Sequence, residues 1–192
     1  MRILKKSKTR SHRSLFVRLF CVLLLAACQF GCSREPQASA TIQILSPDFQ
    51  SGAAIPKQFT CDGGGLSPAL SWQNLPPNTK SLALIMNDSD SLFGRFVHWI
   101  SYNISPQPNH LQEGLPTQET LPNSAKQGLN SDNAIGYTGP CPPGSSAHHY
   151  VFAIYALDTV LSLPPRPSKK ELTNAMRGHV LATGQLIGQY HR

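Results

Sequence analysis

Four groups of polar residues in this chain carry side chains suited to binding an anion or a metal ion. They are Asp88 and Asp90, His98, His148, and the Gly- and Pro-rich loop 136–143. Each group lies within a strongly apolar run or at its end, and the end of a strand is a rigid mount for a binding site. We therefore expect separate strands to bring the two acids and the two imidazoles to one concave place.

Imidazoles at such a place, held by neighbouring carboxylates, favour binding of a negatively charged ligand. A histidine donates hydrogen bonds to an anion, and protonation adds a charge-assisted attraction. A carboxylate beside the ring fixes its tautomer and supports its charged form, so Asp88 or Asp90 is expected to pair with His98 or His148. Backbone N–H groups of loop 136–143 can complete a small anion nest, while the prolines keep that loop rigid.

Structural roles are the competing interpretations of the same residues. A lone histidine on an apolar strand, such as His98, is often a core residue with its hydrogen bonds satisfied. An Asp pair followed by serine is also typical of a capped turn. Both alternatives stay open at this point.

Enzymatic chemistry has little support in the motifs. Two Asp and two His are metal-ligand types, but the chain has no HExxH, CxxC or GxSxG motif. Ser145 and Ser146 precede His148, and nothing marks either as a nucleophile. We expect a non-enzymatic binding protein without a cofactor, with a metal-dependent hydrolase as the less favoured alternative.

Short apolar runs separated by Pro and Gly are typical of a β-rich fold. They predict strands at 41–45, 70–72, 81–86, 96–104 and 149–157, a short strand ending at Thr60, and a closing strand from 180–182 to 185–188. The run 81–86 fits a central strand buried on both faces. Residues 105–136 lack periodicity and predict loops with one short strand.

Strict alternation divides the strand 96–104 into two faces. One face would carry Phe96, His98, Ile100, Tyr102 and Ile104, and the other Val97, Trp99, Ser101 and Asn103.

One substantial helix is expected near the C-terminus. Ser168 and Glu171 have the spacing of a capping box. Leu172 and Met176 would share one helix face, and Gly178 is a suitable stop.

The first 27 residues predict an export signal, because a basic stretch without acids precedes a short apolar run. The run ends in Leu-Ala-Ala-Cys, which resembles a bacterial lipobox. Cys28 is therefore expected to carry an acyl chain such as palmitate, which would anchor an envelope lipoprotein that faces the periplasm. An ordinary signal peptide with an incidental Cys28 is one alternative. Gly31-Cys32 is a second, poorer lipobox, because Gln29 stands where an aliphatic residue is expected. Residues 28–40 are expected to form a flexible tether, and residues 41–192 one domain.

The net charge gives no reason to expect a nucleic-acid partner. The chain has 17 Lys and Arg against 10 Asp and Glu, but seven of the basic residues and none of the acids lie before Cys28. The remaining charges balance, whereas a nucleic-acid-binding domain needs a basic face.

Export also places the cysteines in an oxidising compartment, where a disulfide persists. Cys61 and Cys141 both lie in loops rich in Gly and Pro, so we predict that they pair. Two free, buried thiols are the alternative, because sequence does not determine connectivity.

Taken in order, these motifs resemble the phosphatidylethanolamine-binding protein family, in particular its bacterial Raf-kinase-inhibitor-like branch. Residues 59–72 are similar to the opening signature of that branch, residues 87–91 to its Asp-Pro-Asp-Ala-Pro motif, and His98-Trp99 to its His-Trp strand. Loop 136–143 and residues 148–150 are similar to its Gly-Pro-x-Pro-Pro and His-Arg-Tyr block. Residues 178–182 fit its C-terminal region.

The resemblance implies a mostly β fold of two antiparallel sheets with a C-terminal helix. It also implies a shallow pocket for phosphate, acetate or phosphorylated head groups, including those of phospholipids. By position, the pocket would be lined by Asp88, Asp90, His98, Gly139, Pro140, Pro142, His148 and Tyr150. Some relatives regulate other proteins, so an inhibitor of a protease or other envelope partner is the alternative function.

Three positions depart from the family pattern. Ser89 and Ser91 replace two prolines of the Asp-Pro-Asp-Ala-Pro motif, and His149 replaces an arginine. A less rigid loop and the loss of a permanent positive charge near the pocket mouth are expected.

Overall fold

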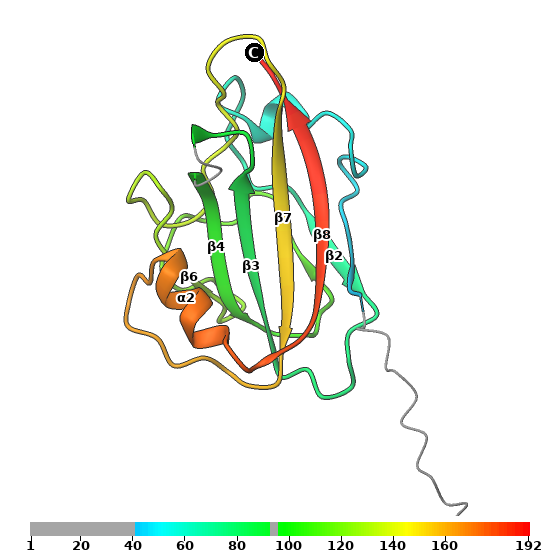
Figure 1. Cartoon of the computed structure of the whole chain (residues 1–192), viewed down its shortest axis with the longest axis vertical. Coiled ribbons are helices and arrows are strands. Elements are labelled where there is room, and N and C mark those ends of the chain that lie inside the picture. Colours follow the sequence, from blue (N-terminus) through cyan, green and yellow to red (C-terminus); the bar gives the residue numbers. More distant parts are fainter. Residues whose placement is uncertain (1–40, 93–95) are drawn as a thin grey trace, which may run out of the picture. The chain divides into compact units, whose positions relative to one another are not determined.

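Two antiparallel sheets enclose one apolar layer. The computed structural model describes residues 41–92 and 96–192 (Figure 1). The larger sheet has the order β6-β4-β3-β7-β8, with strands Lys126–Gln127, Phe96–Ile104, Ser81–Asp88, His148–Leu157 and Val180–Tyr190. The smaller sheet has the order β1-β2-β5, with strands Gln43–Leu45, Leu70–Gln73 and His110–Leu111. This architecture confirms the predicted mostly β, two-sheet fold.

The strand β3 forms the centre of the larger sheet and is buried on both faces, as predicted. Leu82, Leu84 and Met86 face the layer between the sheets. Ala83 and Ile85 face the opposite side, where the helix α2 (Lys169–Met176) packs next to β4 (Figure 1). The unbroken apolar run 82–86 is therefore explained by two cores, one on each face.

The capping box that predicted α2 is present at its first turn. The Ser168 hydroxyl accepts the Glu171 amide, and the Glu171 carboxylate accepts the Ser168 amide. Leu172 and Met176 are both buried against the sheet. Gly178 follows the helix with φ +79°, a left-handed conformation that glycine adopts without a steric cost.

Two irregularities make the predicted faces of β4 wrong. The pairing with β3 skips His98, and a second shift lies near Asn103, which has φ +53°. Each extra residue reverses the alternation that follows it. As a result Val97 lies in the same core as Ile100 and Tyr102, and the side chain of Ile104 lies in the core that holds Trp99.

The strand predicted to end at Thr60 is wrong as well. Only Ala54 makes a bridge there, parallel to Gln189 of β8. Pro56 then supplies no N–H for a ladder, and the 3-10 helix η1 (Lys57–Phe59) follows. The other differences from the predicted strands are small. Thr41 makes an isolated bridge before β1, and β7 begins at His148, one residue earlier than predicted. The closing strand β8 is continuous, and residues 105–136 hold two short strands where one was predicted.

The outer edge of β8 is covered by the N-terminal part of the domain. Ile42 donates to the Thr183 carbonyl, and Ile55 donates to that of Gln189. Gly184 allows this approach, because a Cβ there would overlap the backbone oxygen of Ile42. The covered edge has no free row of backbone groups to pair with other chains.

The predicted signal peptide 1–27, the acylated Cys28 and the tether 28–40 lie outside the described residues. In the part of the chain that the structure covers, no helix has the length and apolar character to cross a membrane.

Gly184→Ala is expected to lower the free energy of unfolding by about 2 kcal/mol or more, because its methyl group would displace backbone that cannot swing aside. Equilibrium urea denaturation measures the effect. Gly64→Ala is the matched control, since its Cβ would make ordinary contacts of 3.5 Å with Leu66 Cγ and 3.6 Å with the Gln58 oxygen. Equal unfolding midpoints for the two variants would contradict the proposed role of Gly184.

Candidate functional site

A cavity of about 780 Å³ lies where β3 ends and where β4 and β7 begin. We call it the strand-end cavity. Seven of the eight predicted site residues line it, and Pro140 is the exception. The Pro140 carbonyl accepts a hydrogen bond from the Cys61 amide at 3.1 Å. The lining consists of Asp88, Asp90, Ser91, Leu92, Phe96, His98, Ser131, Asp132, Thr138, Gly139, Cys141, Pro142, Pro143, His148 and Tyr150.

Asp88, the last residue of β3, both caps a turn and orients a histidine. Its Oδ1 accepts the amides of Asp90 at 2.9 Å and of Ser91 at 3.0 Å. Its Oδ2 lies 2.7 Å from Nδ1 of His148, the first residue of β7. Asp88 therefore has both expected roles, because it caps the turn and also orients a histidine. The residue is buried, with 5% of its surface exposed.

A second Asp–His pair lies beside the first and is more exposed. Asp90 Oδ2 accepts the His149 amide at 2.7 Å and lies 2.9 Å from His149 Nδ1. The amide, followed by the imidazole, holds the pKa of the Asp90 carboxyl below its ordinary value. Asp90 thus pairs with His149 rather than with His98 or His148, and His149 itself does not line the cavity.

The two serines that stand where the family pattern has prolines hold this turn by hydrogen bonds. The Ser89 hydroxyl donates to the His149 carbonyl at 3.1 Å. The Ser91 hydroxyl donates to the Asp88 carbonyl at 2.9 Å and accepts the Phe96 amide at 3.1 Å. Side-chain bonds across the turn therefore provide restraint that the prolines would otherwise supply.

His98 combines a core position with a place in the cavity wall. It is the residue that the β3–β4 pairing skips, and it lies between the rings of Phe96 and Tyr150, with centroid distances of 4.6 and 5.2 Å. Its Nδ1 lies 2.8 Å from the Thr138 carbonyl, so its partner is a backbone oxygen rather than the predicted carboxylate. Burial lowers the pKa of His98, against smaller opposing effects from Thr138, Asp88 and Asp132.

Tyr150 is buried and has an unsatisfied hydroxyl. Within the described residues its Oη has no hydrogen-bond partner, although a buried hydroxyl normally has one. Burial, and then the charges of Asp88 and Asp90, raise the pKa of Tyr150, so the hydroxyl stays protonated. Its position in the cavity lining makes it a candidate donor to a ligand.

The loop that closes the cavity is tied to the segment after η1. Cys61 and Cys141 form the predicted disulfide, with Cα atoms 5.4 Å apart, so the alternative of two free thiols is wrong. Gly139 fits closely against this segment, because a Cβ there would lie 2.8 Å from the Phe59 oxygen and 2.9 Å from Thr60 Cα. These ties place the loop as one wall of the cavity.

Few amides of this loop are left for the predicted anion nest. The Thr138 amide donates to the His98 carbonyl, and the three prolines have no N–H. Among the cavity-lining residues of the loop, the amides of Gly139 and Cys141 have no partner in the described chain.

Sequence reasoning missed several lining residues. Phe96 lies two residues before His98, and Thr138 lies in the predicted loop next to Gly139, so both could have been included by position. Ser131 and Asp132 come from the long irregular segment, in which no periodicity or motif marks them. Their place depends on the Ser131 amide, which donates to the Val97 carbonyl, and on its hydroxyl, which accepts the Val97 amide.

The charged side chains in the described part of the lining are acidic. Three carboxylates line the strand-end cavity, and no Lys or Arg does so among the residues that the structure describes. In residues 41–92 and 96–192, His, Cys, Asp and Glu side chains nowhere gather in threes to hold a metal ion. The two predicted acids and two predicted histidines thus do not form a ready metal centre.

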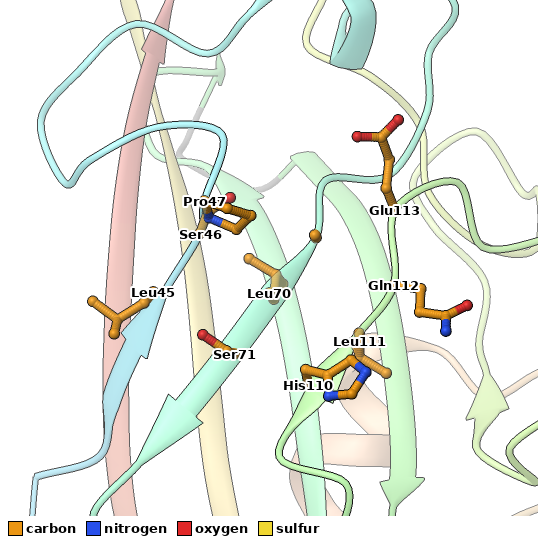
Figure 2. A pocket seen from close by; sticks show the side chains of 10 residues that line it. Leu45, Ser46, Pro47, Leu70, Ser71, His110, Leu111, Gln112 and Glu113 are labelled. Atoms are coloured by element: carbon orange, nitrogen blue, oxygen red, sulfur yellow. The ribbon is translucent and has the colours of Figure 1, made fainter.

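A second depression, of about 620 Å³, lies on the smaller sheet (Figure 2). Leu45, Ser71 and His110 are neighbours across the three strands and form part of its lining. Its lining includes none of the predicted site residues, so the strand-end cavity is the candidate site.

Comparisons with known proteins agree with the fold. The family model described as phosphatidylethanolamine-binding protein matches residues 45–191. A UPF0098 protein from Methanothermobacter thermautotrophicus is 46% identical over 144 residues, covering 75% of this chain and 95% of that relative. A UPF0098 protein from Pyrococcus horikoshii is 42% identical over 165 residues, covering 84% of this chain and 82% of that relative.

Two crystal structures are similar over most of the chain. A phosphatidylethanolamine-binding protein homolog from Chlamydia trachomatis has 42% identity and a TM-score of 0.72. E. coli YbcL, described as a member of the mammalian family, has 29% identity and a TM-score of 0.73. Each comparison covers 80% of this chain and 99% of the other.

Tyr150→Phe is expected to leave the free energy of unfolding unchanged or to raise it by about 1 kcal/mol, because it removes a buried polar atom without a partner. Tyr137→Phe is the matched variant, since its buried hydroxyl donates to the Phe59 carbonyl at 2.7 Å. That change should cost about 1–2 kcal/mol. Urea denaturation of both variants tests the contrast, and a loss of stability in Tyr150→Phe as large as that in Tyr137→Phe would contradict it.

Proposed function

Because the chain belongs to the phosphatidylethanolamine-binding protein family, we propose that it is a non-enzymatic binding protein whose strand-end cavity holds phosphate-like anions or phosphorylated head groups. One observation carries the proposal. His98 from β4 and His148 and Tyr150 from β7 meet at one cavity, and no described residue is a partner of either Nε2 or of the Tyr150 hydroxyl.

The polar groups of this cavity suit an oxyanion with several oxygens. Two ring nitrogens, one hydroxyl and the amides of Gly139 and Cys141 come from three separate segments, so a single small ligand would have to present several hydrogen-bonding atoms to satisfy them. A phosphate group presents such atoms in a tetrahedral arrangement. The family name supports the same ligand class, since phosphatidylethanolamine carries a phosphate in its head group.

The apolar part of the lining supports a ligand with a carbon stem. Leu92, which is 88% exposed, and Phe96, Pro142 and Pro143 line the same cavity as the polar groups. Apolar walls with a few placed polar groups are typical of small-molecule sites. A phosphorylated organic molecule, including a phospholipid head group, would therefore use more of the lining than free phosphate does.

His148→Ala is expected to weaken binding of phosphoethanolamine about 10- to 100-fold, because it removes a ring nitrogen from the cavity and leaves Asp88 without its partner. Isothermal titration calorimetry measures the affinity. His179→Ala is the matched control, since His179 Nδ1 lies 2.8 Å from Asp158 Oδ1 at the other end of β7. Equal affinities for the two variants would refute the assigned site.

We also propose that the protein is an exported lipoprotein anchored through Cys28. The basic and apolar composition of residues 1–27 and the Leu-Ala-Ala-Cys sequence support this location. An acyl anchor would keep the cavity near a membrane surface, where phospholipid head groups are abundant.

Cys28→Ala is expected to abolish incorporation of radiolabelled palmitate and to move most of the protein out of the membrane fraction, because the acceptor sulfur is lost. Cys32→Ala, four residues further on, is the control and should keep both label and location. Undiminished labelling of Cys28→Ala would show that the anchor is elsewhere.

A further inference from the structure

Residues 141–147, which we call the wall segment, run into β7 and supply three residues of the strand-end cavity lining (Figure 1). Six of its seven residues are exposed. In the described part of the chain, hydrogen bonds stop at the Pro140 carbonyl, which accepts the Cys61 amide, and resume at His148. Apart from the chain itself, the disulfide at Cys141 is therefore the one bond that holds the wall segment to the described residues.

The other cysteine of the disulfide lies on a firmly held turn. Next to Cys61, the Thr60 hydroxyl donates to the Lys57 carbonyl at 2.9 Å. On its other side, the Asp62 carboxylate accepts the hydroxyl of Tyr190, at the end of β8, at 2.7 Å. The disulfide thus fastens a sparsely bonded segment to a fixed support.

The part of the cavity that carries His98 is held by other bonds. The Thr138 amide donates to the His98 carbonyl at 2.9 Å, and Asn130 donates to the Thr138 hydroxyl at 2.8 Å. The Tyr137 hydroxyl donates to the Phe59 carbonyl at 2.7 Å. A domain of about 150 residues also buries enough apolar surface to fold without a covalent staple. Loss of the disulfide would therefore free the wall segment and leave the sheets in place.

Both cysteines are exposed residues. A thiolate must reach one sulfur of a disulfide to break it, and exposed disulfides are the labile and regulatory ones. We propose that the Cys61–Cys141 disulfide is a redox switch, which a protein dithiol reduces in the folded state, and that its reduction frees the wall segment and weakens ligand binding. The effect on binding rests on the proposed function, whereas the reaction at the disulfide does not.

The exchange transfers two electrons and two protons from the dithiol to the disulfide. One thiolate of the reductant attacks the sulfur of Cys61 or Cys141, the S–S bond breaks, and a mixed disulfide forms. The second thiolate of the reductant then displaces the protein sulfur, and the reductant leaves as a disulfide. Cys61 and Cys141 remain as two thiols, each with a proton, and the wall segment is no longer fastened to the turn.

The wall segment contributes to the site through its position. Cys141, Pro142 and Pro143 line the cavity, Pro142 is buried, and the Cys141 amide is one of the free donors. With the disulfide in place, these groups are held ready for a ligand. A freed segment must be ordered again on binding, and for a few residues this is expected to lower the affinity about 10-fold.

Reduction of the folded full chain tests the reaction. Dithiothreitol serves as the dithiol, and labelling with N-ethylmaleimide followed by peptide mass spectrometry identifies the thiols. Cys61 and Cys141 should both be labelled without denaturant, while the fluorescence of the fully buried Trp72 and Trp99 stays unchanged. Reduction that needs urea, or loss of the folded signal on reduction, would overturn the inference.

Calorimetry with phosphoethanolamine tests the effect on binding. Reduction should raise the dissociation constant about 10-fold. The double variant Cys61→Ser, Cys141→Ser should show the weaker affinity with or without dithiothreitol, and Cys32→Ser is the matched control that should respond like the unaltered chain. Equal affinity of the oxidised and reduced chains would overturn the inference and leave the proposed function standing. No binding by the oxidised chain would refute the proposed function, and the effect on binding with it.

Reciprocal linkage gives a readout that a purely structural disulfide would not move. If the oxidised chain binds phosphoethanolamine about 10-fold more tightly, saturating ligand lowers the midpoint potential of the disulfide by about 30 mV, which is a factor of ten for a two-electron couple. Redox titration in dithiothreitol buffers, with and without the ligand, measures this shift. A midpoint that the ligand leaves unchanged would overturn the inference.

Discussion

Asp88 accepts three hydrogen bonds at the end of β3, and the shape of the strand-end cavity depends on them. One carboxylate oxygen takes the amides of Asp90 and Ser91 and turns the chain out of the sheet. The other takes Nδ1 of His148, which lies on the neighbouring strand. Removing one partner of a buried hydrogen bond leaves the other unsatisfied, at a cost of about 1–3 kcal/mol. The turn, the strand end and the imidazole therefore stabilise one another.

The cavity lies at the rim of the apolar layer between the sheets, and this place explains its chemistry. Met86 and Phe152, two residues inward from Asp88 and Tyr150, are fully buried in that layer. Polar atoms so close to a core are expensive to leave unpaired. The buried Tyr150 hydroxyl, which has no partner among the described residues, is thus retained at a cost in stability that a ligand with a matching acceptor would offset.

Local patterns predicted the elements whose environment is uniform along their length. Residues 82–86 of β3 are all apolar because both faces of the sheet are covered, and the α2 capping box acts within one helical turn. Periodicity failed in β4, where the extra residues at His98 and near Asn103 reverse the faces. Such a bulge is set by pairing with β3 and by the bonds of Asn103 to Leu161, which lies 58 residues away.

The sequence by itself determined which residue types stand at the strand ends, that the chain is β-rich, and which motifs connect it to its family. Spacing along the chain carries this information, because turns, caps and alternation are local. Only the tertiary structure decided that Asp88 pairs with His148 and Asp90 with His149, that His98 binds a carbonyl, and that Asp132 joins the cavity. These contacts join segments about 40–60 residues apart in sequence, and their geometry follows from strand register and loop closure, which no local pattern encodes.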